Sequence, residues 1–168
     1  MHGRTDAAVL VALYEHDARL HAVFTRRRDD LRRHAGEISF PGGRQNAGED
    51  LHTTALREAE EEIGLPPDAV QLAGALPPTA TFVTNYAVYP FVGVIEPGHR
   101  WKPSAAEVAE VLELPLDDLA SGFERRRLVR RGVPFRTDVY TVGGNVVWGA
   151  TARILSDLLE RLRPLLAG

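Results

Sequence analysis

Four glutamates and one arginine lie within six residues of this 168-residue chain, in the run 57–62, and together could hold a cation. The residues around them favour a helix, because alanine, leucine and glutamate are strong helix formers. Gly64 and the two prolines that follow it predict the end of that helix, and Asp50 is a suitable N-cap. We therefore predict a helix over residues 50–63, with the glutamates in its last turns.

The position of this charge is unfavourable for a helix. The macrodipole already places partial negative charge at a helix C-terminus, and like charges four residues apart repel. Glu58, Glu61 and Glu62 share one face of the predicted helix, so three carboxylates converge on one patch. One interpretation is a solvated acidic face. The unfavourable placement favours the other, a bound divalent cation, because Mg²⁺ takes carboxylate and carbonyl oxygens.

The composition is that of an ordinary globular protein. Hydrophobic residues make up 44%, charged residues 26%, and the net charge is −3, which argues against a general nucleic-acid binder with a basic field. The absence of cysteine excludes disulfides and thiolate metal sites. The N-terminal apolar stretch, about seven residues, is too short to cross a bilayer, and it has no signal-peptide pattern. We expect a cytoplasmic protein with neither nucleic acid nor membrane as partner.

The remaining pattern predicts the elements that must position the glutamates. Apolar runs bounded by turn residues predict strands at 7–14, 20–25, 38–40, 69–76, 86–95, 125–135 and 139–149. Pro90 inside one of them indicates a bulge or an edge position. Residues 107–120 combine a short strand with a helical turn after Pro115, and an apolar stripe predicts a helix over 151–162. We expect one α/β domain over residues 1–168, with a mixed sheet and helices on both faces.

The glutamate helix and the residues before it resemble the Nudix box, G-x5-E-x7-R-E-U-x-E-E-x-G-U, where U is a bulky apolar residue. Gly43, Glu49, Arg57 and Glu58 fall at the required spacing, and the other fixed positions are met through Leu65. Such a long match is far more specific than a lone glycine motif. The resemblance implies a Nudix-type α/β/α sandwich with a mixed β-sheet, and metal-dependent hydrolysis of a diphosphate linked to a nucleoside.

The resemblance also implies roles for individual residues. Glu61 would be a further metal ligand or the base that deprotonates the attacking water, Glu49 would assist from outside the direct ligands or through a water, and Arg57 would hold the carboxylates through ion pairs. Phosphoryl transfer needs mainly positioning and charge neutralisation, so no covalent nucleophile is required. The implied ligands of Mg²⁺ or Mn²⁺ are Glu58, Glu62, Glu61 and the carbonyl of Gly42.

The residues before the box resemble a narrower group, the Nudix coenzyme A pyrophosphatases, with the pattern L-L-T-x-R-S-x-x-L-x-x-H-x-G-x-V-x-F-P-G-G. The positions in register are Thr25, Arg27, Leu31, His34, Gly36, Ile38, Phe40, Pro41, Gly42 and Gly43. Arg28 replaces the usual serine and Asn46 an acidic residue, whereas 89–93, 107–119 and 147–155 also resemble this group. The resemblance implies hydrolysis of coenzyme A and its acyl derivatives to 4′-phosphopantetheine, or its acyl form, and adenosine 3′,5′-bisphosphate.

Five arginines within residues 26–33 could fork onto phosphate oxygens. Arg27 is our preferred phosphate contact. The alternative for any single arginine is an ion pair with Asp29 or Asp30 in a solvated loop. His34 either binds the substrate or holds the loop in shape.

Three other features have structural explanations. Ser104 and Glu107 match a helix capping box, which we favour over a role for Glu107 near the metal. Trp148 and Phe82 could stack on adenine, but buried aromatic residues usually belong to the core. The arginine cluster 125–131 matches no motif, and we interpret it as surface or as the rim of a dimer.

Three functions remain open. The favoured one is a coenzyme A diphosphatase, and the second is a Nudix diphosphatase for ADP-ribose, a dinucleotide or an oxidised nucleotide. The third is a non-catalytic Nudix-like ligand-binding module, which we disfavour because the glutamate set is complete. We expect a small nucleotide as substrate and Mg²⁺ or Mn²⁺ as cofactor, and leave a homodimer open.

Overall fold

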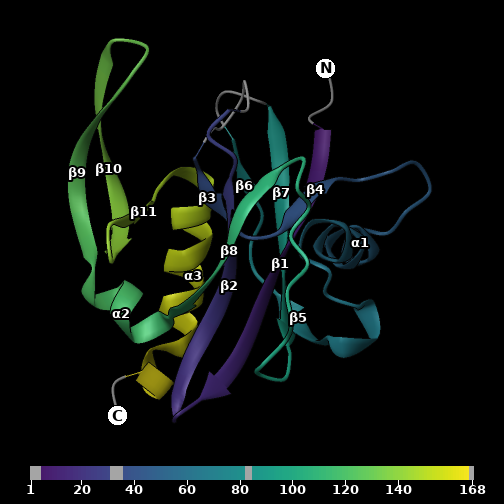
Figure 1. The fold of residues 1–168 in the computed structure, drawn as a ribbon. Helices are drawn as coiled ribbons and strands as arrows, with labels where there is room; N and C mark the ends of the chain where they lie inside the picture. The colour runs from purple at the N-terminus through teal and green to yellow at the C-terminus, as the bar shows by residue number, and fades with distance from the viewer. Residues whose placement is uncertain (1–4, 31–35, 82–84, 167–168) are drawn as a thin grey trace.

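The computed structural model describes residues 5–30, 36–81 and 85–166. His34 and Phe82, for which the sequence offers binding roles, lie outside the described residues. The elements, shown in Figure 1, are β1 (Thr5–His16), β2 (Arg19–Arg27), β3 (Ile38–Ser39), β4 (Gly42–Arg44), α1 (Leu51–Ile63), a 3₁₀ turn (Pro67–Ala69), β5 (Gln71–Ala75), β6 (Thr79–Ala80), β7 (Tyr86–Val94), β8 (Val108–Pro115), α2 (Leu116–Ser121), β9 (Phe123–Arg130), β10 (Val133–Val142), β11 (Asn145–Val147) and α3 (Gly149–Leu166).

The main sheet is mixed, as the sequence predicts. β1 pairs in parallel with β7 and antiparallel with β2 and β4. β2 follows β1 only as far as Ala22 and then pairs with β3, while the first part of β1 pairs with β4. The segment 38–44 therefore fills the gap where β1 and β2 diverge, and it brings the double glycine into the middle of the sheet.

Two hydrophobic cores cover the two faces of the sheet, because successive residues of a strand point to opposite sides. On one face Leu10 and Ala12 pack with Ala59 and Ile63 of α1. On the other face Val11 packs in a cluster that includes residues of α2 and α3, namely Leu116, Leu119, Ile154, Leu155 and Leu158. Figure 1 shows α1 and α3 on opposite sides of the sheet, which confirms the predicted α/β/α sandwich. No helix in the described ranges has the length and apolar character needed to cross a bilayer.

Pro90 does not mark an edge strand, so that part of the sequence prediction is wrong. β7 lies between β1 and β5 in the sheet, with Pro90 opposite Val9. The Pro90 carbonyl accepts a hydrogen bond from the Leu76 amide at 3.0 Å. The Pro90 nitrogen, which carries no hydrogen, therefore faces the interval between the end of β5 and the start of β6. No strand residue there requires a hydrogen bond from it.

The strands β9, β10 and β11 form a separate three-stranded sheet on the α3 side of the molecule (Figure 1). The region 125–135, predicted as one strand, contains a turn at Arg131 and Gly132, which both have positive φ. Gly143 and Gly144 form the second turn, as predicted, also with positive φ. Arg26 joins the two sheets, because its guanidinium donates to Glu110 of β8 and to Asn145 of β11.

Candidate active site

The glutamate-rich end of α1 is held by the chain that follows it. Gly64 adopts a left-handed conformation with φ 74°, and its amide donates to the Glu60 carbonyl at 2.9 Å. The amides of Lys102 and Ser104 donate to the carbonyls of Ile63 and Glu62 at 2.9 and 2.8 Å. These donors satisfy carbonyls that a helix end leaves unpaired, so the end of α1 is fixed despite its crowded charge.

Glu62 lies against the backbone of the double glycine. The Gly42 amide donates to Glu62 Oε2 at 3.2 Å. The pKa of the Glu62 carboxyl is raised to about 8, mainly by burial and in smaller part by the negative charges of Glu58 and Glu107, against the lowering effect of the Gly42 hydrogen bond. A buried carboxylate that accepts so few hydrogen bonds is costly in its charged form, and a nearby positive charge would stabilise that form.

Glu58 lies next to Glu62 on the same face of α1, directly above Gly43. A Cβ atom on Gly43 would lie 2.5 Å from the Glu58 carboxyl carbon, so no larger residue fits there while the carboxylate keeps its place. Burial also raises the pKa of Glu58, against the lowering effect of Arg57. Glycine is therefore required at position 43 for a steric reason, because only glycine lets the sheet backbone approach the Glu58 carboxylate this closely.

Arg57 holds three carboxylates. Its Nε donates to Glu49 Oε2 at 2.7 Å, and its Nη1 donates to Glu58 Oε1 at 3.0 Å and to Glu61 Oε2 at 3.2 Å. The expected contact between Arg57 and Glu61 is thus present, but Glu49 makes the shorter one. The Arg57 and Thr54 hydrogen bonds lower the pKa of Glu49 to about 2. Glu49 is therefore engaged by Arg57 and Thr54, an arrangement that positions the arginine.

Replacing Gly43 with alanine is expected to lower kcat by about 100-fold, because the Glu58 carboxylate must move by roughly 1 Å and misplacement on that scale costs about that much. Gly74→Ala is the matched control, since a Cβ there meets nothing within 4 Å. Steady-state kinetics and melting temperatures of both variants provide the measurement. Equal activity in the two variants would show that the position of Glu58 is unimportant.

Arg27 reaches the same place from the end of β2. It lies on the α1 side of the sheet, and its positive charge is among the influences that lower the pKa of Glu62. Its Nε is buried and finds no hydrogen-bond partner among the described residues. A buried guanidinium nitrogen without an acceptor can donate to an anion, such as a phosphate, that binds beside the carboxylate cluster.

The capping-box interpretation of Ser104 and Glu107 is wrong. The Glu107 amide donates to the Ser104 carbonyl at 3.1 Å in a turn, and the chain then enters β8 without forming a helix. β8 pairs with β2, with Val108 opposite Arg27, so Glu107 is carried to the carboxylate cluster. Its charge contributes to the raised pKa values of Glu58 and Glu62. The short motif could not reveal that strand pairing determines this position.

The carboxylates fit a divalent cation that is only partly coordinated by protein. Glu58 and Glu62 offer oxygen ligands in a buried, negatively charged setting, which a hard cation would neutralise. Across residues 5–30, 36–81 and 85–166, no three acidic or histidine side chains are gathered closely enough to form a complete site on their own. Mg²⁺ commonly keeps several waters and takes substrate phosphate oxygens, so this incomplete set is the kind that it uses with a phosphorylated substrate.

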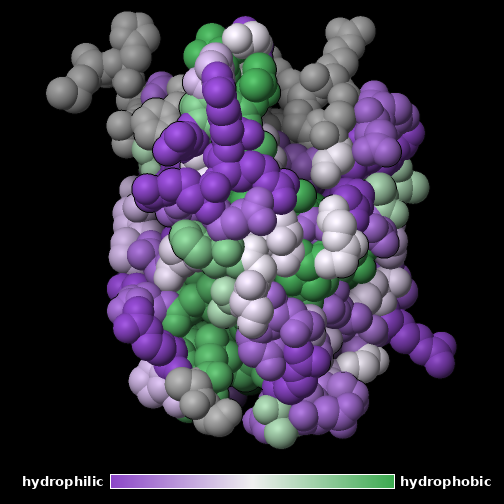
Figure 2. Space-filling view, turned by 90° about the vertical axis from the view of Figure 1, so that its left-hand side faces the viewer, coloured by the Kyte–Doolittle hydropathy of each residue, from purple (hydrophilic) through white to green (hydrophobic). Residues whose placement is uncertain are grey.

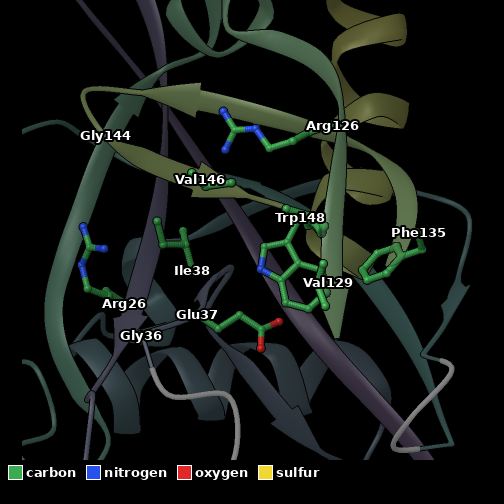
Figure 3. Close-up of a pocket in the computed structure, with 11 residues that line it drawn as sticks. Arg26, Gly36, Glu37, Ile38, Arg126, Val129, Phe135, Gly144, Val146 and Trp148 are labelled. Carbon is green, nitrogen blue, oxygen red and sulfur yellow. The ribbon is translucent and has the colours of Figure 1, made fainter. Parts of the chain in front are cut away.

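A pocket of about 580 Å³ lies on the other face of the sheet. Figure 3 shows Trp148, Val129 and Phe135 gathered on one side of it, Arg126 at the rim and Glu37 below the indole. Trp148 is half-buried and lines this pocket rather than the core, contrary to the interpretation favoured from sequence. Arg126 belongs to the arginine cluster interpreted as surface. The sequence contains no sign that Arg126 and Trp148 line a pocket with Glu37, because these residues are far apart in the chain.

Comparison with known proteins agrees with the geometry. The model of the NUDIX domain family matches residues 4–151. The uncharacterized Nudix hydrolase NudL of Pectobacterium atrosepticum is 38% identical over 161 residues, which cover 94% of this chain and 83% of the relative. The protein of the same name from Citrobacter koseri is 39% identical over 158 residues, which cover 92% and 81%.

Solved structures share the fold at low sequence identity. A MutT/nudix family protein from Enterococcus faecalis has a TM-score of 0.69 at 14% identity, covering 98% of this chain and 64% of that one. The NUDIX domain of Shewanella oneidensis NrtR, complexed with ADP ribose, has a TM-score of 0.62 at 15% identity, covering 96% and 90%. A C. elegans Ap4A hydrolase has a TM-score of 0.58 at 17% identity, covering 70% and 84%.

Proposed function

This chain belongs to the NUDIX family, and from that membership we propose that it hydrolyses the diphosphate of coenzyme A and of its acyl derivatives. Membership makes it a Nudix hydrolase acting on a diphosphate substrate; coenzyme A is the narrower proposal. The products would be 4′-phosphopantetheine, or its acyl form, and adenosine 3′,5′-bisphosphate. Residues 1–168 would form one Nudix domain.

The observation that carries the proposal is the meeting of two motifs. The segment 25–43 resembles coenzyme A pyrophosphatases, and the helix that follows it carries the Nudix glutamates. Gly42 of the first motif donates to Glu62 of the second, and Arg27 of the first influences the same carboxyl. The two motifs thus contribute to one site, as expected if the arginine binds the phosphates that a cation on the glutamates also binds.

Glu58 and Glu62 would hold Mg²⁺ or Mn²⁺, with the Gly42 carbonyl as a further oxygen. When bound, the cation would neutralise charge on the diphosphate oxygens and make the attacking water more acidic. Arg27 would bind a diphosphate oxygen and stabilise charge that develops as the bridging bond breaks.

The remaining residues of the box would support these ligands. Glu61 has 58% of its side chain exposed, more than Glu58 with 17%, and lies where solvent water can reach it. It would take the proton from the attacking water. Arg57 would keep the orientation of Glu58 and Glu61, and Glu49 would keep that of Arg57. Glu107 lies close enough for its charge to raise the pKa values of Glu58 and Glu62.

The substrate is tested by measuring kcat/KM for coenzyme A, dephospho-coenzyme A, ADP-ribose and diadenosine tetraphosphate, with products identified by mass. Coenzyme A is expected to be the best, and dephospho-coenzyme A roughly ten- to a hundred-fold poorer, because a charge-assisted contact to the 3′-phosphate contributes about 1.5–3 kcal/mol. ADP-ribose turnover tenfold above that of coenzyme A would overturn the proposal. The second function, a diphosphatase for other nucleoside diphosphates, would then stand.

The same measurement on Arg27→Ala locates the contact made by Arg27. Because this side chain lies beside Glu62, we expect it to bind the diphosphate and the variant to lose equally on coenzyme A and dephospho-coenzyme A. A larger loss on coenzyme A would instead place the 3′-phosphate at Arg27. Arg28→Ala is a useful comparison, because Arg28 is already paired with Asp30 and with the Ala105 carbonyl.

A further inference from the structure

We propose that the pocket between β3 and the β9–β10 hairpin binds the nucleotide end of the substrate, and that Arg126 selects for a phosphate monoester on the ribose. The proposal rests on the proposed function, because it concerns the same substrate. It adds a specificity residue from a part of the chain that has no Nudix motif. The pocket, about 580 Å³, has room for a nucleoside.

The pocket and the carboxylate cluster lie on opposite faces of the sheet but are joined by one segment. Arg26 and Arg27 are neighbours at the end of β2, where the register with β8 shifts. Arg26 lines the pocket, whereas the charge of Arg27 acts on Glu62 of α1. Ile38 lines the pocket, and Gly42, four residues later, bonds to Glu62. Four extended residues span about 13 Å. A nucleotide with its diphosphate is long enough to span that distance along the segment from Ile38 to Gly42.

The lining suits a base. Trp148 offers an aromatic face next to Phe135 and Val129, and base–aromatic stacking contributes about 1–3 kcal/mol. Figure 3 shows the Glu37 carboxylate on the floor of the same space, beneath the indole. A carboxylate accepts hydrogen bonds from an exocyclic amine such as that of adenine. The combination of aromatic face and acceptor fits an aminated base better than a plain acyl chain.

Arg126 provides the charge for a phosphate. It points from β9 to the rim of the pocket, as Figure 3 shows, with 37% of its side chain exposed. It pairs with Glu124, which is on the same strand and 46% exposed, and exposed ion pairs of this kind are weak. Arg26 is less available, because Glu110 and Asn145 already engage it. Figure 2, which views the hairpin face, shows hydrophilic side chains across the middle of this face, with hydrophobic atoms at its top and hydrophobic surface below.

The neighbouring Arg125 provides a matched control. It pairs with Asp138 and lines a different pocket, on the opposite side of the hairpin, together with Arg136. Removal of either arginine changes the net charge by the same amount on adjacent residues of one strand. Only Arg126 should therefore affect binding in the pocket of Trp148.

The test measures binding of adenosine 3′,5′-bisphosphate and of AMP by tryptophan fluorescence and by calorimetry. Wild-type protein should bind the bisphosphate roughly ten- to a hundred-fold more tightly than AMP, and both should quench fluorescence. Arg126→Gln should bring the ratio close to one while AMP binding persists. Arg125→Gln should keep the ratio, and Trp148→Phe should abolish the quenching.

A preserved ratio in Arg126→Gln, or an equal loss in Arg125→Gln, would overturn the assignment of Arg126. Quenching that survives in Trp148→Phe would overturn the assignment of the pocket. If coenzyme A is hydrolysed but either of these results appears, the subsite is wrong and the proposed function stands. If the bisphosphate binds as described but coenzyme A is not hydrolysed, the proposed function is wrong and the nucleotide pocket stands.

Discussion

Glutamine in place of Glu62 is expected to lower kcat by roughly 10³ or more, equivalent to about 4 kcal/mol of lost transition-state stabilisation. The Glu62 carboxylate is the most deeply buried of the cluster, and burial raises its pKa to about 8. A group held in such an unfavourable setting gains most from a cation, and neutral glutamine cannot supply the charge. Glu58→Gln should have an effect of the same order. Steady-state kinetics over a range of Mg²⁺ concentrations measures both.

Glu60→Gln is the control within the same turn of α1. Its side chain is exposed, on the side of the helix away from Glu58 and Glu62, so the substitution should change kcat by less than about twofold. Glu61→Gln should lower kcat more than it weakens metal binding, if Glu61 accepts the proton from water. A Glu60 variant as impaired as Glu62→Gln would show that the catalytic face of the helix has been misassigned.

The sequence predicts the parts of this site that depend on local order. The helix, its glycine terminus and the face shared by Glu58 and Glu62 follow from residues close together in the chain, and the structure contains all three. The helical layers that cover the sheet also follow from the order of the elements and the periodicity of their apolar residues. These features need no knowledge of which strand pairs with which.

Features that depend on strand pairing could not be predicted in this way. Glu107 joins the cluster only because β8 pairs with β2, and its local sequence resembles a helix cap. Arg126 and Trp148 meet Glu37 only because the β9–β10 hairpin folds over β3. An interior strand tolerates Pro90 because the neighbouring chain is interrupted beside it, between the end of β5 and the start of β6. In each case the position of the residue is determined by contact with a different strand, and the local sequence does not reveal that contact.

Chelation of divalent cations is expected to abolish hydrolysis, and addition of Mg²⁺ or Mn²⁺ should restore it. The physical reason is that Glu58 and Glu62 are buried close to each other and to Glu107, and the described residues offer them few donors. The same reason predicts an effect on stability. At a cation concentration about 100 times the Kd, binding to the folded state alone contributes roughly 2.7 kcal/mol, or roughly 5–10 °C in Tm for a chain of this size.

The stability measurement separates a cation bound by the protein from one that arrives only with the substrate. Wild-type protein without substrate should show the rise in Tm, Glu62→Gln should lose most of it, and Glu60→Gln should keep it. Loss of the rise in all three proteins, with activity still dependent on Mg²⁺, would mean that the cation enters as a complex with the diphosphate. Full hydrolysis in excess chelator would exclude both routes, because then the buried carboxylates would act without any cation to neutralise them.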